Sequence, residues 1–373
     1  MTSDNKNGGL RSFNDAGLYP PIVEVLKAMK ISVPTKIQAE ILGPARDGLD
    51  IIAISATGSG KTIAYLLPLF EMLKRDERTR GLILTPTRET ADQILKVLEP
   101  FADELGLSLS LVIGGRSAAK QENELKSRAR IVVATPGRLN DHLLNNKLLL
   151  QETRFVVVDE ADRMLDMGFA PQLQFIQKTM RGKWQTILCS ASSLEQIQKV
   201  SHVFAQSEPV VVSSGSVEAP VEKLNQTVVR LERKDKSRRL MTDIESCKGS
   251  VLVFAASQER CDLVHRFLSK AGVNVDLLHG GLRQGHRNRV MRDFRGKVIK
   301  VLIATDVLAR GLDVDHVDLV INVDLPYHAE DFLHRIGRTA RAGRSGRAIT
   351  YITPDDHKKL PDIERYLEGA KFE

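Results

Sequence analysis

Short, uninterrupted apolar runs recur along the chain, each followed by a turn and then by a segment with helical spacing. In the first part of the chain these runs are 50–54, 81–84, 109–113, 131–134, 155–158 and 186–188. Helical segments such as Ile63–Arg75 and Ala91–Leu105 lie between them. Strands that are apolar on both faces are typical of a parallel sheet covered by helices on either side. The alternation predicts a doubly wound α/β domain.

The same alternation begins again after a polar stretch. Residues 213–222, rich in Ser, with Gly and Pro, follow an apolar run that closes the first series, and we interpret them as a linker. A chain of 373 residues is long enough for two cores. We therefore expect two α/β domains in tandem, at 13–212 and 223–373, each a mainly parallel sheet with helices on both faces. A disordered arm is expected at 1–12.

Composition restricts the class of protein without deciding the function. The net charge of +7 suggests a polyanionic partner, although a mildly basic surface gives the same value. Three cysteines lie in apolar or helical contexts without metal-ligand spacing, and we expect them to be reduced and buried. The N-terminus lacks the apolar core of a signal peptide, and no apolar run is long enough to span a membrane. We expect a cytoplasmic protein.

The segment 55–62 has the pattern of a phosphate-binding loop between a strand and a helix. Its residues are Ser55, Ala56, Thr57, Gly58, Ser59, Gly60, Lys61 and Thr62. The two glycines allow backbone N–H groups to approach phosphate oxygens, and the new helix directs its positive end toward them. Lys61 supplies a charge for the β- and γ-phosphates, and Thr62 a hydroxyl for Mg²⁺.

A second acidic motif completes the predicted nucleotide site. The apolar run 155–158 delivers Asp159 and Glu160 directly after its end. Phosphoryl transfer needs a carboxylate for Mg²⁺ and another that orients or deprotonates the attacking water. We assign Asp159 to the metal and Glu160 to the water. Acidic turn residues alone would be uninformative; their place about a hundred residues after the loop favours this assignment.

At this point the sequence resembles the DEAD-box RNA helicases, whose name is spelled by residues 159–162. The resemblance extends from Phe13 to about residue 347, and implies two RecA-like domains that use ATP and Mg²⁺. The family recognises adenine through a motif that corresponds to 11–39, which implies this role for Phe13 and Gln38. A glutamine amide both donates and accepts hydrogen bonds, so it can distinguish adenine from guanine.

Several short motifs match those with which the family contacts RNA. They are Pro86, Thr87 and Arg88; Gly114 and Gly115; Thr135, Pro136, Gly137 and Arg138; Gln284 and Arg287; and Thr305. Each follows a predicted strand end, where ligands bind in open α/β sheets. Hydroxyls, glycine N–H groups and arginines suit phosphates and 2′-hydroxyls. Aromatic residues make up only 5% of the chain, which argues against base stacking. We expect binding to single-stranded RNA with little sequence preference.

The second predicted domain carries two further family motifs, at 304–313 and 334–341. The resemblance assigns Gly311 and Asp313 to the nucleotide, with Asp313 on the ribose. It assigns Arg335 and Arg338, three residues apart, to the γ-phosphate as arginine fingers. Because the active site is then divided between the domains, ATP and RNA should both favour a closed state. In the family, closing bends the RNA and separates a short duplex.

The chain departs from the family pattern at three points. Ser55-Ala56 replaces the usual Ala-Gln, and Thr90 stands where leucine is usual. The family's Ser-Ala-Thr is here Ser190-Ala191-Ser192. The resemblance implies that Ser190 and Ser192 link Asp162 to His334 across the domains. Serine lacks the methyl group that restricts threonine's χ1, so we expect weaker coupling with intact ATP chemistry.

Two other functions remain open from the sequence. One is an ATP-gated RNA clamp that seldom unwinds, although Glu160 and the two arginines speak against lost hydrolysis. The other is a DNA helicase, because the basic charge suits either polymer and only the motif resemblance favours RNA. We expect a monomer.

Overall fold

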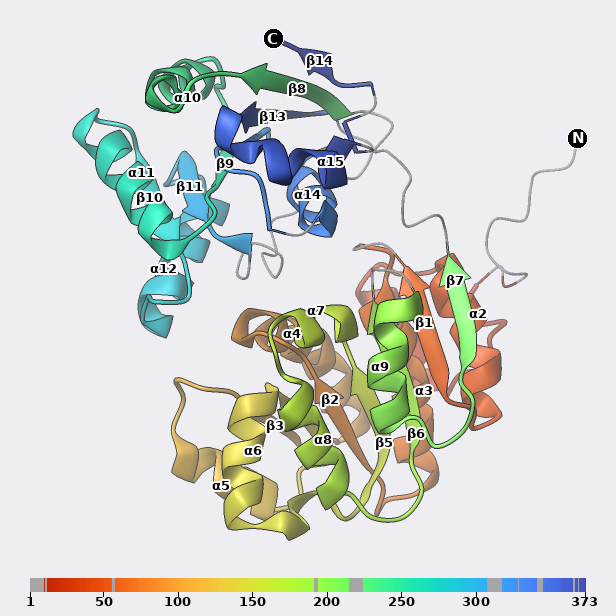
Figure 1. Ribbon diagram of the computed structural model, residues 1–373. Helices are drawn as coiled ribbons and strands as arrows, with labels where there is room; N and C mark the ends of the chain where they lie inside the picture. Colours follow the sequence, from red (N-terminus) through yellow and green to blue (C-terminus); the bar gives the residue numbers. More distant parts are fainter. Residues whose placement is uncertain are drawn as a thin grey trace, which may run out of the picture. The chain divides into compact units, whose positions relative to one another are not determined.

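A computed structural model describes residues 10, 12–55, 58–190, 194–214, 224–306, 317–327, 329–340, 345–364, 366–367 and 369–373. The chain divides into two compact units, Met1–Glu218 and Ala219–Glu373 (Figure 1). This division falls within 213–222, the stretch predicted to be a linker, although Ser213 and Ser214 of that stretch end a strand of the first sheet. Each unit is described by itself below.

The first unit contains the strands β1 Ile51–Ser55, β2 Arg80–Leu84, β3 Leu109–Val112, β4 Ile131–Ala134, β5 Thr153–Val158, β6 Gln185–Ser190 and β7 Val210–Ser214. Its helices are α1 Pro20–Ala28, α2 Lys36–Arg46, α3 Lys61–Arg75, α4 Arg88–Leu105, α5 Ala118–Lys126, α6 Pro136–Asn145, α7 Ala161–Asp166, α8 Ala170–Thr179 and α9 Leu194–Phe204, with the 3-10 helix η1 Lys147–Leu150.

The strands of the first unit form one parallel sheet in the order β3-β4-β2-β5-β6-β1-β7. Its central strands β1, β2, β4 and β6 are buried along their whole length, as apolar runs covered on both faces should be. One core cluster joins the sheet to α1–α4, and a second joins the other face to α5–α9 (Figure 1).

The second unit contains the strands β8 Leu224–Arg230, β9 Val251–Phe254, β10 Val275–Leu278, β11 Val301–Ala304, β12 Leu319–Asn322, β13 Gly346–Ile352 and β14 Lys371–Phe372. Its helices are α10 Lys236–Glu245, α11 Gln258–Lys270, α12 Gln284–Arg295, α14 Ala329–Ile336 and α15 Leu360–Glu364, with the 3-10 helices η2 Arg233–Asp235 and η3 Pro354–Lys358.

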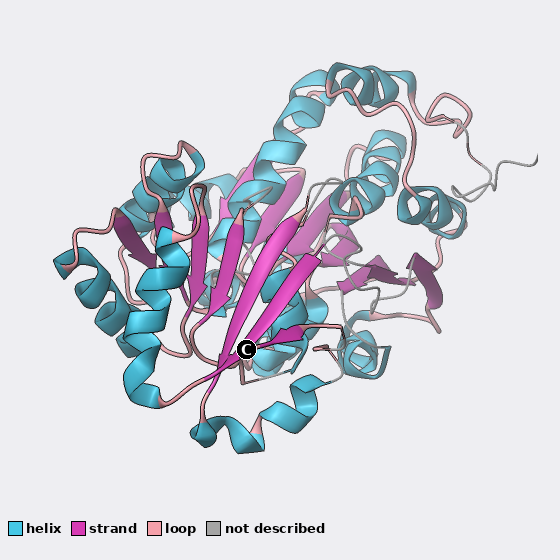
Figure 2. Cartoon of the chain, turned by 90° about the horizontal axis from the view of Figure 1, so that it is seen from above, coloured by secondary structure: helices cyan, strands magenta, loops and turns pink. Residues whose placement is uncertain are grey.

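The second sheet has the order β10-β11-β9-β12-β13-β8-β14, again with parallel pairs. Figure 2 shows the strands and helices of the chain in separate colours. Helices α10 and α11 cover one face, while α12, α14 and α15 cover the other. The predicted fold of two parallel sheets with helices on both faces is confirmed. Strands β8 and β14 were not predicted, because β8 is half exposed and interrupted by polar residues, and β14 has two exposed residues.

Parallel strands bring their carboxyl ends to one edge of each sheet, and this edge collects the predicted site residues. In the first unit β1, β6 and β5 lead to the nucleotide motifs, whereas β2, β4 and β3 lead to the RNA motifs. The two groups meet between β5 and β2, where Asp159 N donates to Leu84 O at 2.9 Å.

Candidate nucleotide and RNA site

The phosphate-binding loop lies between the end of β1 and the start of α3, as predicted. Gly58 and Gly60 have φ values of +83° and +92°, which only glycine adopts without strain. A Cβ on Gly60 would also lie 2.5 Å from Gln38 Nε2. Ser59 Oγ is buried without a hydrogen-bond partner in the described part of the chain, which suits a loop built for a ligand. Ala56 and Thr57 lie outside the described residues.

Gln38 is fixed against this loop. Its Nε2 donates to Gly60 O at 3.1 Å, and its Oε1 accepts from Thr35 N at 2.8 Å, at the start of α2. Phe13, which the resemblance also assigned to adenine, is 2% exposed and belongs to the hydrophobic core shared by α1 and α2. The structure therefore brings Gln38 to the loop but places the Phe13 ring in the core.

Asp159 follows β5 and is joined to α3 by Tyr65. The Tyr65 hydroxyl donates to Asp159 Oδ2 at 3.0 Å and also forms a side-chain hydrogen bond with Thr62. Lys61 Nζ donates to Ser55 O. Burial, and to a smaller extent the charge of Glu160, raise the pKa of Asp159 to about 6. A cation beside this carboxylate would offset the cost of ionising it.

The residues around Asp159 fit Mg²⁺. A carboxylate and the Thr62 hydroxyl are hard oxygen donors, which this ion prefers. No cluster of three or more His, Cys, Asp or Glu suited to a metal occurs among the residues that the structure describes. Mg²⁺ in nucleotide sites usually takes one or two protein oxygens and completes its shell with phosphate and water.

Glu160 occupies an unusual backbone position. Its φ and ψ are 54° and 50°, in the left-handed region, where it precedes the first turn of α7. Such positions cost about 1–3 kcal/mol in a non-glycine residue and cluster at functional sites. Its Oε2 accepts from Nη1 of Arg163 at 2.9 Å, and Arg163 is 4% exposed. Arg163 thus fixes the carboxylate that we assign to the water.

Asp162 and Ser190 are brought together at the ends of β5 and β6. Ser190 Oγ donates to Asp162 Oδ2 at 2.6 Å, and both residues are buried. Ser192 lies outside the described residues, and His334 belongs to the second unit. Of the residues predicted to couple the units, the structure thus shows the contact between Ser190 and Asp162.

The RNA motifs of the first unit lie next to one another at the ends of β2, β3 and β4. Thr87 caps α4 by accepting from Thr90 N at 3.2 Å. A Cβ on Gly114 would lie 2.6 Å from Arg88 Nη2, so the guanidinium packs directly on this glycine. Arg138, in the first turn of α6, donates from Nη2 to Arg116 O at 3.0 Å. Thr90, the departure from the family, contacts Thr87 and leaves the motif intact.

The remaining first-unit residues of this group occupy the same edge. Thr135 follows β4, Pro136 and Gly137 begin α6, and Pro86 and Gly115 lie in the loops after β2 and β3.

In the second unit, Gln284 and Arg287 lie in the first turn of α12 after β10, and Thr305 follows β11. The strands β10 and β11 are neighbours, so these residues share one edge. Gly311 and Asp313 lie outside the described residues.

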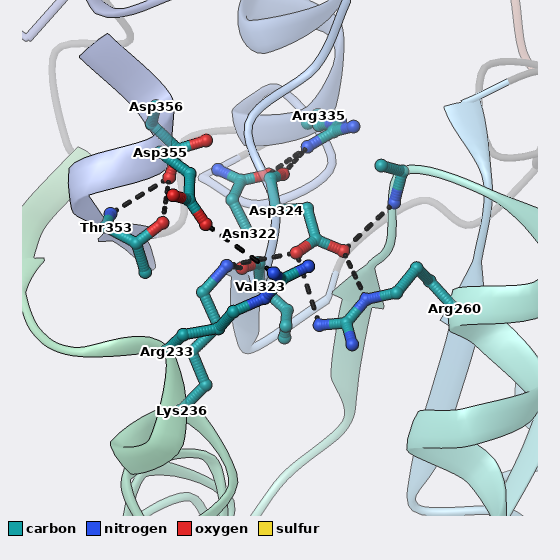
Figure 3. A network of polar contacts seen from close by, with 11 residues as sticks. Arg233, Lys236, Arg260, Asn322, Val323, Asp324, Arg335, Thr353, Asp355 and Asp356 are labelled. Atoms are coloured by element: carbon teal, nitrogen blue, oxygen red, sulfur yellow. Dashed lines mark hydrogen bonds and ion pairs between the residues drawn. The ribbon is translucent and has the colours of Figure 1, made fainter.

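Arg335, predicted as an arginine finger, lies in a buried network of polar contacts within the second unit. It is 1% exposed, and its guanidinium forms a bidentate ion pair with Asp306, at 2.5 Å from Nε and 2.7 Å from Nη2. Nη1 donates to Asp324 O at 2.6 Å and to Asn322 Oδ1 at 3.3 Å (Figure 3). The group also lies 5.0 Å from the centre of the Phe254 ring.

Asp324 extends this network to two further helices. Its carboxylate accepts from Lys236 Nζ at 3.0 Å and from Arg260 Nε at 3.3 Å (Figure 3). These cations lower its pKa although burial alone would raise it. Arg338 is 3% exposed and donates from Nε to His334 O at 3.3 Å. Arg335 therefore holds the 334–338 segment to β11 and β12.

Three contributors were missed by sequence reasoning. Tyr65 lies four residues after Lys61 on α3 and could have been found from that spacing, as could Arg163, three residues after Glu160. Asp306 lies within the family motif at 304–313, but its partner Arg335 is distant in sequence, so their ion pair could not be predicted.

Comparisons with known proteins match both units of the chain. A family model described as DEAD/DEAH box helicase matches residues 35–200, and one described as Helicase conserved C-terminal domain matches 232–343. The probable ATP-dependent RNA helicase DDX47 of Mus musculus is 38% identical over 365 residues, covering 97% of this chain and 80% of that protein. The pre-mRNA-processing ATP-dependent RNA helicase PRP5 of Mycosarcoma maydis is 38% identical over 97% of this chain. This chain spans only 32% of the length of PRP5.

Solved structures resemble nearly the whole chain. Dbp5 of S. cerevisiae bound to RNA and ADP BeF3 has a TM-score of 0.84 at 30% identity, covering 97% of this chain and 95% of that one. Mss116p bound to ssRNA and AMP-PNP has a TM-score of 0.84 at 26% identity, covering 96% and 78%. In the described part of this chain, no helix is long and apolar enough to cross a membrane.

Proposed function

This chain belongs to the DEAD/DEAH box helicase family, and from that premise we propose that it is an ATP-dependent RNA helicase. The observation that carries the proposal is the division of one sheet edge. The phosphate loop and the acidic motif occupy the half formed by β1, β6 and β5, and the RNA motifs occupy the half formed by β2, β4 and β3. An edge divided in this way would put a nucleotide beside a nucleic-acid strand on the same sheet.

ATP hydrolysis would use first-unit residues in separate roles. Lys61 binds the β- and γ-phosphates, and Glu160, oriented by Arg163, positions the attacking water. Asp159 and Thr62 would hold Mg²⁺, which when bound neutralises charge on the phosphates. Gln38 binds adenine through its amide.

RNA binding would rest on the backbone of the strand rather than on its bases. Thr87, Arg88, Gly114 and Arg138 provide hydroxyl, guanidinium and backbone groups suited to phosphates and 2′-hydroxyls. Gln284, Arg287 and Thr305 would add contacts from the second unit. Little sequence preference follows from this set.

Coupling would follow from closure of the two units on both ligands. Arg338 then contacts the γ-phosphate and Asp313 the ribose, while Arg335 keeps the segment of Arg338 in place from within its own unit. Ser190 and Ser192 link Asp162 to His334. The units separate again after hydrolysis, and the protein acts as a monomer in the cytoplasm.

The test is ATPase activity measured with an RNA oligonucleotide, with DNA of the same sequence, and without nucleic acid, together with separation of a short RNA duplex. We expect stimulation by RNA, little stimulation by DNA, and ATP-dependent strand separation. ATPase without strand separation would identify an ATP-gated clamp, and equal stimulation by DNA would contradict RNA specificity.

A further inference from the structure

Gln121 on α5 is a buried polar residue to which none of the roles above applies. It is 3% exposed, and α5 carries no residue of the proposed nucleotide or RNA motifs. A buried amide is costly unless its hydrogen bonds are satisfied. Its partners therefore indicate what it holds together.

Both ends of the Gln121 amide are used. Nε2 donates to Ile113 O at 2.9 Å, which is the carbonyl directly before Gly114. Oε1 accepts from Arg138 Nε at 3.0 Å and contacts His142 Nε2 at 3.1 Å. These contacts fix the orientation of the amide. If it were flipped, its oxygen would face the Ile113 carbonyl oxygen and its NH2 group would face the N–H groups of Arg138 and His142.

His142 completes the arrangement from α6. Burial, and next the charge of Arg138, lower the pKa of its ring below the ordinary value. The neutral ring with a proton on Nε2 donates to Gln121 Oε1, and Arg138 donates to the same oxygen. The two residues lie four apart on α6, so the amide oxygen fixes the helix face that carries Arg138.

The neighbouring contacts extend the arrangement to a third segment. Arg138 Nη2 donates to Arg116 O at 3.0 Å, and Arg116 pairs with Asp92 of α4 at 2.8 Å. Arg88, in the first turn of α4, packs on Gly114. The loop after β3 is thus held against the starts of both α4 and α6, and Gln121 makes the buried contact.

We propose that Gln121 is a positioning residue for RNA binding, which sets the spacing between the Gly114-Gly115 loop and the Arg138 face of α6. This proposal rests on the RNA contacts proposed above. An RNA backbone has fixed phosphate spacing, so displacement of one segment weakens every contact that must form together. Gln121 itself does not touch the RNA.

Gln121→Met tests this role because it keeps the length of the side chain and removes all three polar contacts. We expect the RNA concentration that half-saturates ATPase stimulation to rise about tenfold. The rate at saturating RNA and the affinity for ATP without RNA should stay within about twofold. The matched control is Gln174→Met on α8, an exposed glutamine, which should leave all three quantities unchanged.

Gln121→Glu provides a second variant in case the methionine variant fails to fold. It keeps acceptors for Arg138 and His142 but places a carboxylate oxygen against Ile113 O. We expect a similar rise in the half-saturating RNA concentration. A lower melting temperature with unchanged RNA dependence in a folded variant would show that Gln121 only stabilises the fold, and would overturn the proposal.

Arg138→Ala separates failure of this proposal from failure of the proposed RNA site. If Arg138→Ala weakens RNA binding while the Gln121 variants do not, the RNA site stands and the positioning role of Gln121 is wrong. If Arg138→Ala leaves RNA binding unchanged, the RNA contacts of α6 are themselves wrong, and the positioning proposal falls with them.

Discussion

Arg335→Ala should destabilise the second unit rather than simply slow catalysis. The substitution removes a guanidinium that is 1% exposed and leaves Asp306, whose side chain is 16% exposed, without its bidentate partner. It also leaves Asp324 O without the donor at 2.6 Å. An arginine finger, in contrast, can be removed without harm to the fold, so stability distinguishes the two roles.

The magnitude follows from the contacts. Removing one partner of a buried ion pair costs about 3–5 kcal/mol, because the remaining charge is uncompensated. With a urea m-value of about 2 kcal/mol/M, the unfolding midpoint of the second unit should fall by about 1.5–2.5 M. Arg335→Lys keeps the charge without the planar fork and should lie between the alanine variant and the parent. Arg292→Ala, at a side chain that is 76% exposed, is the matched control and should change stability by about 0.5 kcal/mol or less.

The chain allows the two units to be followed separately. Its one tryptophan, Trp184, is buried in the first unit, where Nε1 donates to Phe204 O at 2.9 Å. In urea unfolding of Arg335→Ala, the transition followed by tryptophan fluorescence, which reports the first unit, should be nearly unchanged. The transition of the second unit, followed by circular dichroism, should shift to a lower urea concentration. If both transitions match those of the parent while ATPase activity is lost, Arg335 acts on the nucleotide, and its contacts do not stabilise the second unit as proposed.

Other substitutions test the first unit. Lys61→Ala should abolish ATP turnover with an unchanged melting temperature, and near-normal ATPase activity would refute the phosphate-loop assignment. Glu160→Gln keeps the hydrogen bonding but removes the carboxylate, so its ATP–RNA complex should dissociate more slowly than that of the parent; an equal dissociation rate would contradict its role. Because burial raises the pKa of Asp159 from its ordinary value of 3.8 to about 6, the ligand-free fold loses stability as the pH rises between these two values, and the loss is complete above the higher one. Asp159→Asn should therefore raise the melting temperature at about pH 7.5 and lose this advantage toward about pH 4. If the difference in melting temperature between Asp159→Asn and the parent did not depend on pH, the raised pKa of the buried Asp159 carboxyl would be refuted.

The architecture was predictable because it depends on local pattern. Strands such as β1 and β4 are almost entirely apolar runs, and a parallel sheet buried on both faces requires such runs. The glycine-rich loop between β1 and α3 was predictable for the same reason, since its chemistry lies within eight consecutive residues. Strand β8 was not predicted because only part of it is buried, so polar residues interrupt its apolar pattern.

The roles of individual side chains were less predictable, because they depend on partners distant in sequence. Arg335 and Arg338 look equivalent in a basic segment, and only the fold places Asp306 against Arg335. Phe13 stands alone in the sequence, yet the packing of α1 and α2 takes it into the core. Gln121 looks like any polar residue of an exposed helix until Ile113 and Arg138 are brought to either end of its amide.

The most direct test of ATP-gated RNA binding is the affinity for a labelled single-stranded RNA, measured by fluorescence anisotropy with and without a non-hydrolysable ATP analogue and Mg²⁺. Closure on both ligands predicts that the analogue tightens RNA binding at least about tenfold, corresponding to a coupling free energy of about 1.4 kcal/mol. By reciprocity, RNA should tighten binding of the analogue by the same factor. Equal RNA affinity with and without the analogue would contradict the central claim that ATP and RNA both stabilise the same closed state.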